Sequence, residues 1–260
     1  MRRNLKWVVG LGLTLAIGAS GIVLAASAPT TIVRAGNLVL KLSGELTPRV
    51  LPKGVPAPVG LHERTSLTTI DGSQPPALEE LVFDADRNVF VDVQGLPVCG
   101  RGKLEARDAA TAKRACPDAI LGEGSASVRV AFPEQTPFEA IGPLTVFNGG
   151  VENGVTTLFV HAYVSVPAPT AIVATVKITK EHKGRFGLHI VVLVPKVAGG
   201  SGSVTHTELS ARRLFAYKGR RRSFLSARCS GGRFLARGTL GFRDGTKLFG
   251  SFVVPCRATD

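Results

Sequence analysis

Residues 155–166, VTTLFVHAYVSV, decide the fold class, because they alternate and consist largely of β-branched and aromatic residues. Such side chains fit the pleated surface of a strand, and a period of two is the period of a strand. The stretches 171–178 and 186–194 follow and are apolar on both faces, which is typical of central strands covered on both sides. The middle of the chain therefore predicts three consecutive strands.

The same pattern continues in both directions from this stretch. Expected strands are 38–42, 58–70, 78–83, 89–93, 125–132 and 143–147 before it, and 203–214, 223–229, 233–242 and 247–254 after it. One helix is expected at 104–115, which is rich in Ala and stopped by Pro117. Many short strands without alternating helices predict an all-β protein. We expect an antiparallel β-sandwich of many short strands with one short helix, with an up-and-down β-barrel as the alternative.

Residues 1–28 have the parts of a cleavable signal peptide. Three basic residues within the first six precede an uncharged apolar run, and small residues at 26–28 form a cleavage site. Because Pro29 would hinder a cut directly before it, a cut after Ala25 or Ala26 is equally expected. The chain is therefore expected to be secreted or to reside in the cell envelope.

Two alternatives remain for this segment: an uncleaved signal anchor, and a twin-arginine signal in place of general secretion. After cleavage, no other stretch is long enough to span a membrane as a helix. Residues 29–57 are expected to form an extended, Pro-containing lead-in. Residues 58–260 are expected to form a single all-β domain.

The four cysteines are Cys99, Cys116, Cys229 and Cys256. An even number in an exported chain predicts two disulfides, and a metal site is disfavoured because no C-x-x-C pair occurs. Of the three pairings, we expect Cys99–Cys116 and Cys229–Cys256. If 223–229 and 247–254 flanked 233–242 in one flat sheet, Cys229 and Cys256 would lie about 9–10 Å apart, too far for a bridge. The second disulfide therefore requires a bend, or a place for 223–229 in another sheet.

The 260-residue chain has a net charge of +13, and its charge is uneven. Residues 29–150 hold 12 basic and 14 acidic residues, whereas residues 151–260 hold 17 basic and 5 acidic ones. In an antiparallel sheet consecutive turns alternate between two ends, and by that count three basic turns share one end. This predicted anion-binding pole consists of Lys180, Lys183, Arg185, Lys218, Arg220, Arg221, Arg222, Arg243 and Lys247. Solvated hairpin tips are the alternative interpretation.

No known catalytic motif occurs in the sequence, so no catalytic residue, metal or cofactor is predicted. Asp84 to Asn88 resembles the start of a calcium loop but lacks its Gly and Glu, which favours a turn. His161 and Tyr163 share a strand face with Phe159, and a packed face is the favoured interpretation.

Several short pieces resemble a family of secreted proteins from soil actinobacteria of Solirubrobacter-like lineages, which has no assigned activity. The pieces are DGSQPP (71–76), GLPVC (95–99), AFPEQ (131–135), FNGG (147–150), HAY (161–163), GGSGSV (199–204) and SARC (226–229). The resemblance implies export and one architecture over most of the chain. It transfers no catalytic residue.

These observations lead us to expect a non-enzymatic envelope or extracellular domain whose basic pole binds anionic polymers or surfaces. Expected partners are an anionic cell-wall polymer, anionic lipid head groups or extracellular nucleic acid. The alternatives are a secreted hydrolase, which two facing carboxylates or a Ser–His pair in a cleft would favour, and a barrel that holds a small apolar ligand.

Overall fold

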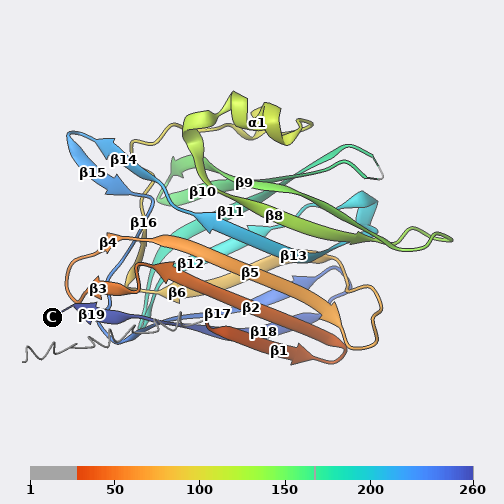
Figure 1. Ribbon diagram of the computed structural model, residues 1–260, viewed down its shortest axis with the longest axis horizontal. Helices are drawn as coiled ribbons and strands as arrows, with labels where there is room; N and C mark the ends of the chain where they lie inside the picture. Colours follow the sequence, from red (N-terminus) through yellow and green to blue (C-terminus); the bar gives the residue numbers. More distant parts are fainter. Residues whose placement is uncertain (1–27, 167, 260) are drawn as a thin grey trace, which may run out of the picture.

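The computed structural model describes residues 28–166 and 168–259 (Figure 1). The predicted signal peptide, up to residue 27, lies outside the described residues. No helix in the described ranges has the length and apolar character needed to cross a membrane.

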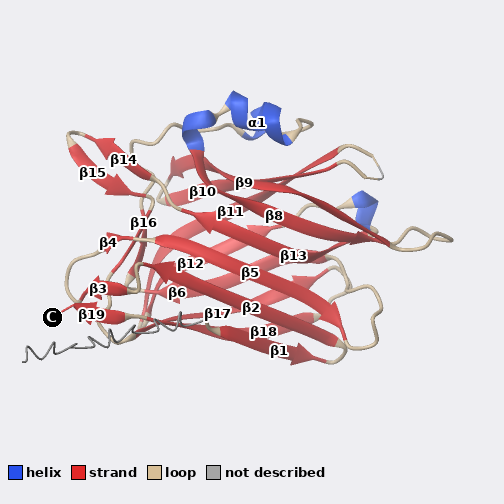
Figure 2. Cartoon of the chain, viewed as in Figure 1, coloured by secondary structure: helices blue, strands red, loops and turns tan. Residues whose placement is uncertain are grey.

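Strands make up most of the described chain (Figure 2). They are β1 (Thr30–Ala35), β2 (Leu38–Thr47), β3 (Val50–Pro52), β4 (Ala57–Pro58), β5 (Gly60–Thr69), β6 (Leu78–Asp86), β7 (Val89–Val91), β8 (Ile120–Val130), β9 (Phe138–Glu152), β10 (Val155–Val164), β11 (Thr170–Lys183), β12 (Phe186–Leu193), β13 (Gly202–Ala211), β14 (Leu214–Tyr217), β15 (Arg220–Ser223), β16 (Leu225–Ala227), β17 (Arg233–Phe242), β18 (Lys247–Pro255) and β19 (Arg257–Thr259). The described helical parts are α1 (Ala109–Ala115) and three short 3-10 turns, at Arg101–Lys103, Pro117–Ala119 and Ala198–Gly200.

One antiparallel sheet holds twelve of these strands, in the order β1-β2-β5-β13-β8-β9-β10-β11-β12-β6-β17-β18. The sheet curls until its edge strands β1 and β18 lie beside each other (Figure 1). Gly250 permits this approach, because a Cβ there would lie 2.9 Å from Val33 Cγ2. The result is a nearly closed barrel. We call the end with the β11–β12 turn rim A, and the end with the β17–β18 turn rim B.

The predicted all-β fold is confirmed. The main sheet is continuous and nearly closed, as in the barrel alternative, and it is not divided into the two sheets of a sandwich. Its order is not up-and-down throughout, because β13 lies between β5 and β8, and β6 lies between β12 and β17. These two insertions join segments far apart in the sequence, and local alternation carries no information about such pairings.

The core follows from the period of two along the strands. β2, β17 and β18 present even-numbered residues to the interior of the barrel. Leu40, Phe242 and Leu248 form a buried cluster toward rim B, and Leu46 and Phe234 belong to the larger cluster toward rim A.

Residues 30–47, within the expected lead-in, form two strands of the main sheet. β1 and β2 form a hairpin, and β2 pairs along its whole length with β5. The proline-rich stretch 48–58 connects β2 to β5 and contains the short strands β3 and β4, which belong to the smaller sheets. Near the end of the chain, β19 pairs in parallel with β3.

The segment 99–119 packs on the outer face of β9, β10 and β11, where α1 lies across the strands (Figure 2). α1 begins at Ala109, later than the predicted 104. Asp108 is its N-cap and accepts a hydrogen bond from the Thr111 N–H (2.8 Å). Ala106 has a positive φ of 54°, a left-handed conformation that interrupts a helix before this point.

Both predicted disulfides are confirmed, with Cα–Cα distances of 5.7 Å for Cys99–Cys116 and 6.0 Å for Cys229–Cys256. The geometric condition is also met, because β16 lies in a separate three-stranded sheet, β4-β16-β7. Cys229 follows β16 and Cys256 follows β18, so this disulfide lies at rim A. The basic β11–β12 turn lies at the same rim.

Candidate anion-binding site

The three basic turns do not share one end of the barrel. β12 and β17 run in the same direction, because each is antiparallel to β6 between them. The turn before β12 and the turn after β17 therefore lie at opposite rims. Lys180, Lys183 and Arg185 lie at rim A, and Arg243 and Lys247 lie at rim B. The alternation of turns fails because β14, β15 and β16 leave the main sheet and add reversals outside it.

Several of the predicted pole residues are held in ion pairs. Arg185 Nε lies 2.9 Å from Asp86 Oδ2, and Arg243 Nη1 lies 3.3 Å from Glu79 Oε1. Both arginines also donate to backbone carbonyls, of Arg233 and Val194 respectively. These contacts tie neighbouring strands together at the rims, so the two arginines stabilise the barrel and leave little charge for a ligand.

The hairpin β14–β15 carries the strongest exposed charge of the three turns, and it projects from the barrel in Figure 1. Lys218 and Gly219 form its turn, with φ angles of 49° and 72° that suit a tight two-residue hairpin. Lys218, Arg220 and Arg221 are exposed. Among the described residues, none of these three side chains has a carboxylate within ion-pair distance.

One face of this hairpin is anchored to the loop after β7. Arg222 Nη1 lies 2.7 Å from Asp92 Oδ2, and its guanidinium lies 5.2 Å from the centre of the Tyr217 ring. The ring packs directly on Gly95, where a Cβ would come within 2.1 Å of it. Lys218 Nζ lies 5.4 Å from the same ring. The anchored face fixes the hairpin, so its free cations occupy a defined place.

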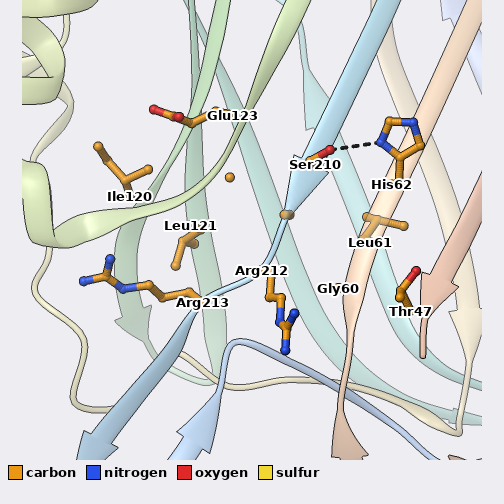
Figure 3. Close-up of a pocket in the computed structure, with 12 residues that line it drawn as sticks. Thr47, Gly60, Leu61, His62, Ile120, Leu121, Glu123, Ser210, Arg212 and Arg213 are labelled. Carbon is orange, nitrogen blue, oxygen red and sulfur yellow. Dashed lines mark hydrogen bonds between the residues drawn. The ribbon is translucent and has the colours of Figure 1, made fainter.

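A pocket of about 470 Å³ lies where β13 ends and the chain leads into this hairpin (Figure 3). Arg212 and Arg213 line it. Arg212 is exposed, and Arg213 Nε is buried without a hydrogen-bond partner in the described chain. Arg213 Nη2 lies 3.8 Å from Asp118 Oδ1, and Oε1 of Glu123 on the pocket wall lies 2.6 Å from Lys113 Nζ. The pocket thus offers guanidinium groups to an anionic ligand.

Ser210 and His62 face each other in the same pocket (Figure 3). They are direct partners across β13 and β5, and His62 Nδ1 lies 2.9 Å from Ser210 Oγ. Glu208 Oε1 lies 3.7 Å from His62 Nε2 and 2.8 Å from Arg64 Nη2. The hydrogen bond and charge of Arg64 lower the pKa of Glu208, so this carboxylate stays ionised beside the imidazole.

The sequence predicted only part of this site. Charge in the sequence predicts Lys218 and Arg220 to Arg222 as binding residues, but it does not predict Arg212, Arg213, His62 or Ser210. Arg212-Arg213 at the end of a predicted strand was the available signal. The pairing of Ser210 with His62 depends on strand register over 148 residues of sequence, which no local pattern encodes.

The two remaining candidates are structural. His161 is fully buried under the segment 99–119, and its ring lies 3.0 Å from the Arg107 carbonyl. Burial lowers its pKa, as the packed interpretation implies. Asp86 Oδ1 accepts from the Asn88 N–H (3.1 Å), which is the turn geometry expected in place of a calcium loop.

Comparisons with family models, with curated proteins and with solved structures found no match to the chain.

Proposed function

We propose that this is an exported, non-enzymatic β-domain that binds anionic polymers through the hairpin β14–β15 and the pocket beside it. The carrying observation is that Arg212, Lys218, Arg220 and Arg221 are exposed within one short segment, without a carboxylate partner among the described residues. Unpaired cations on an ordered scaffold attract polyanions with little cost of rearrangement. The two disulfides are consistent with an oxidising, extracellular environment.

The proposed site contains only some of the residues of the predicted anion-binding pole. Lys180 stays a secondary candidate at rim A, and Lys183 pairs with Glu181 at 2.8 Å. Lys247 lies at rim B and belongs to a different surface. The proposed partners are a phosphate-bearing cell-wall polymer, anionic lipid head groups or extracellular nucleic acid, and the experiment distinguishes these sources.

The test compares two triple variants that remove the same charge. Lys218→Ser, Arg220→Ser and Arg221→Ser together should weaken binding of a fluorescent DNA duplex about tenfold or more at low salt, because three phosphate contacts are lost. The matched control replaces Arg34, Lys177 and Lys247, which are exposed on β1, on β11 and at the start of β18. Arg49 and Arg64 are poor controls, because each pairs with a glutamate.

Equal losses in the two triple variants would overturn the site and leave only the net charge as the cause. Polyphosphate and vesicles containing phosphatidylglycerol serve as further probes in the same titration. Tightest binding to vesicles would assign lipid head groups, and tightest binding to polyphosphate would assign a phosphate polymer.

A second candidate function, ester hydrolysis, is favoured by the Ser210–His62–Glu208 arrangement. Ser210 Oγ would attack the ester carbonyl carbon while its proton moves to His62 Nδ1, which then passes it to the leaving alkoxide. Water then hydrolyses the acyl-serine. An active nucleophile should react with a fluorophosphonate, giving a mass increase at Ser210 that the Ser210→Ala variant lacks. An unlabelled Ser210 would exclude this activity.

A further inference from the structure

A second group of polar side chains meets on the outer face of the barrel, at the strands near the β11–β12 turn. It consists of Asp84 on β6, Glu181 on β11 and His189 on β12, and one potential ligand atom from each lies within 4.8 Å of the others. None of these residues belongs to the candidate anion-binding site.

Strand register brings the three residues together. β12 lies between β11 and β6, and His189 is directly opposite both Asp84 and Thr179. Its neighbours Leu188 and Ile190 point into the core, so His189 points outward. The pairing of β11 with β12 is irregular after Lys180, and Glu181 lies in this irregular part beside the pair.

Charged neighbours surround the group. His189 Nδ1 lies 2.8 Å from Asp84 Oδ1, and Arg237 Nη2 lies 3.1 Å from Asp84 Oδ2. The Arg237 guanidinium is held 4.3 Å above the Phe186 ring. Asp84 is therefore fixed from two sides, by an imidazole and by an arginine that packs on an aromatic ring.

Glu181 is the member whose contacts are incomplete. Its side chain is only 9% exposed, and its Oε1 has no hydrogen-bond partner in the described chain. Lys183 Nζ lies 2.8 Å from Oε2 but without hydrogen-bond geometry, and the Lys183 side chain is 65% exposed. A buried carboxylate oxygen without a partner is costly, because it has lost its hydration. One carboxylate oxygen of Glu181 lies within 4.8 Å of the potential ligand atoms of Asp84 and His189.

We propose that Asp84, Glu181 and His189 bind a divalent first-row transition-metal ion, for which Zn²⁺ is the representative. Imidazole nitrogen together with carboxylate oxygen suits such ions, whereas Ca²⁺ and Mg²⁺ prefer oxygen ligands alone. The two carboxylates balance the charge of the ion, and the ion supplies the hydrogen-bond or charge partner that Glu181 Oε1 lacks in the described chain. The exposed end of the Lys183 side chain is displaced on binding, and Arg237 remains as a neighbour that orients Asp84.

The experiment uses the full chain after treatment with a chelator and then addition of Zn²⁺ or Co²⁺ alone. We expect one Zn²⁺ per chain by calorimetry and a rise in melting temperature. Co²⁺ should give visible absorption bands that report nitrogen and oxygen coordination. His189→Ala and Glu181→Gln should each weaken metal binding by at least about tenfold.

His182→Ala is the matched control, because His182 is an exposed histidine next to Glu181 that lies outside the group. It should bind Zn²⁺ like the unmodified chain. If the His189→Ala variant does not fold, the Co²⁺ spectrum of the Asp84→Asn variant serves as the test instead, because asparagine is nearly isosteric with aspartate. Failure of the unmodified chain to bind Zn²⁺, or equal binding by the Glu181→Gln and His182→Ala variants, would overturn the site.

Discussion

Glu63 is a charged residue on the interior face of the barrel. It lies on the same, inward face of β5 as Leu61 and Leu67, which pack into the core. Burial is the largest influence on its pKa and raises it from 4.5 to about 6, against the opposing hydrogen bonds that the Thr65 and Thr207 hydroxyls donate. The two threonine hydroxyls offset part of the free-energy cost of burying this carboxylate inside the barrel, but they do not remove it.

The raised pKa of Glu63 makes stability depend on pH. The folded state holds the proton more tightly than the unfolded one, so the free energy of unfolding falls as pH rises from 4.5 to about 6 and then stays low. Once Glu63 is ionised in the folded state, this loss of unfolding free energy amounts to about 2 kcal/mol. Glu63→Gln should therefore raise the free energy of unfolding by about this amount at neutral to alkaline pH, and change it little near pH 4, as measured by urea titration.

Glu208→Gln is the control for this substitution. The pKa of Glu208 is lowered because Arg64 donates a hydrogen bond to it, so removing the Glu208 carboxylate should not raise the free energy of unfolding at alkaline pH. A gain from Glu63→Gln that is the same at both pH values would contradict the burial explanation, because an effect of packing alone does not titrate.

At the scale of elements, the barrel carries two additions that the disulfides hold in place. Cys99–Cys116 closes the segment that contains α1, which covers Phe147 and Val173 on the outer face of the sheet. Cys229–Cys256 joins the small sheet containing β16 to the end of β18. Each addition has few strand partners in the main sheet, so covalent closure replaces the missing backbone pairing.

Removing Cys99–Cys116 with a double Cys→Ser variant should cost about 3 kcal/mol of unfolding free energy, because it restores the entropy of a short loop to the unfolded chain. Amide hydrogen exchange should then accelerate in α1 and leave β18 protected. The corresponding variant of Cys229 and Cys256 should instead accelerate exchange in β16. Identical exchange patterns in the two variants would show that the additions do not unfold separately.

At the scale of the whole molecule, the basic residues differ in the rim at which they lie and in whether an acidic residue pairs with them. Arg185 and Arg243 lie at opposite rims and are paired with acids, whereas four exposed cations, Arg212, Lys218, Arg220 and Arg221, have no carboxylate partner among the described residues. Under the proposed function, we expect these four cations to attract a polyanion more strongly than the net charge of +13 spread over the molecule would.

The affinity for the DNA duplex should therefore fall as the salt concentration rises. Four cations that neutralise phosphates predict a log–log slope of about −3 to −4 for the unmodified chain, and about −1 for the hairpin triple variant, which keeps Arg212. The control triple should retain the steeper slope. A shallow slope for the unmodified chain would mean that the cations do not act together.

The sequence by itself determined the all-β class, most strand positions and both disulfides. Alternation over residues 155–166 is a local property, and the two cysteine pairs close short loops, so neither needs knowledge of distant partners. Only the tertiary structure decided which turns share a rim, that Ser210 faces His62, and that Glu181 joins Asp84 and His189. The physical reason is that such neighbours depend on strand order and register, and both are set by pairings between distant segments, such as β13 between β5 and β8.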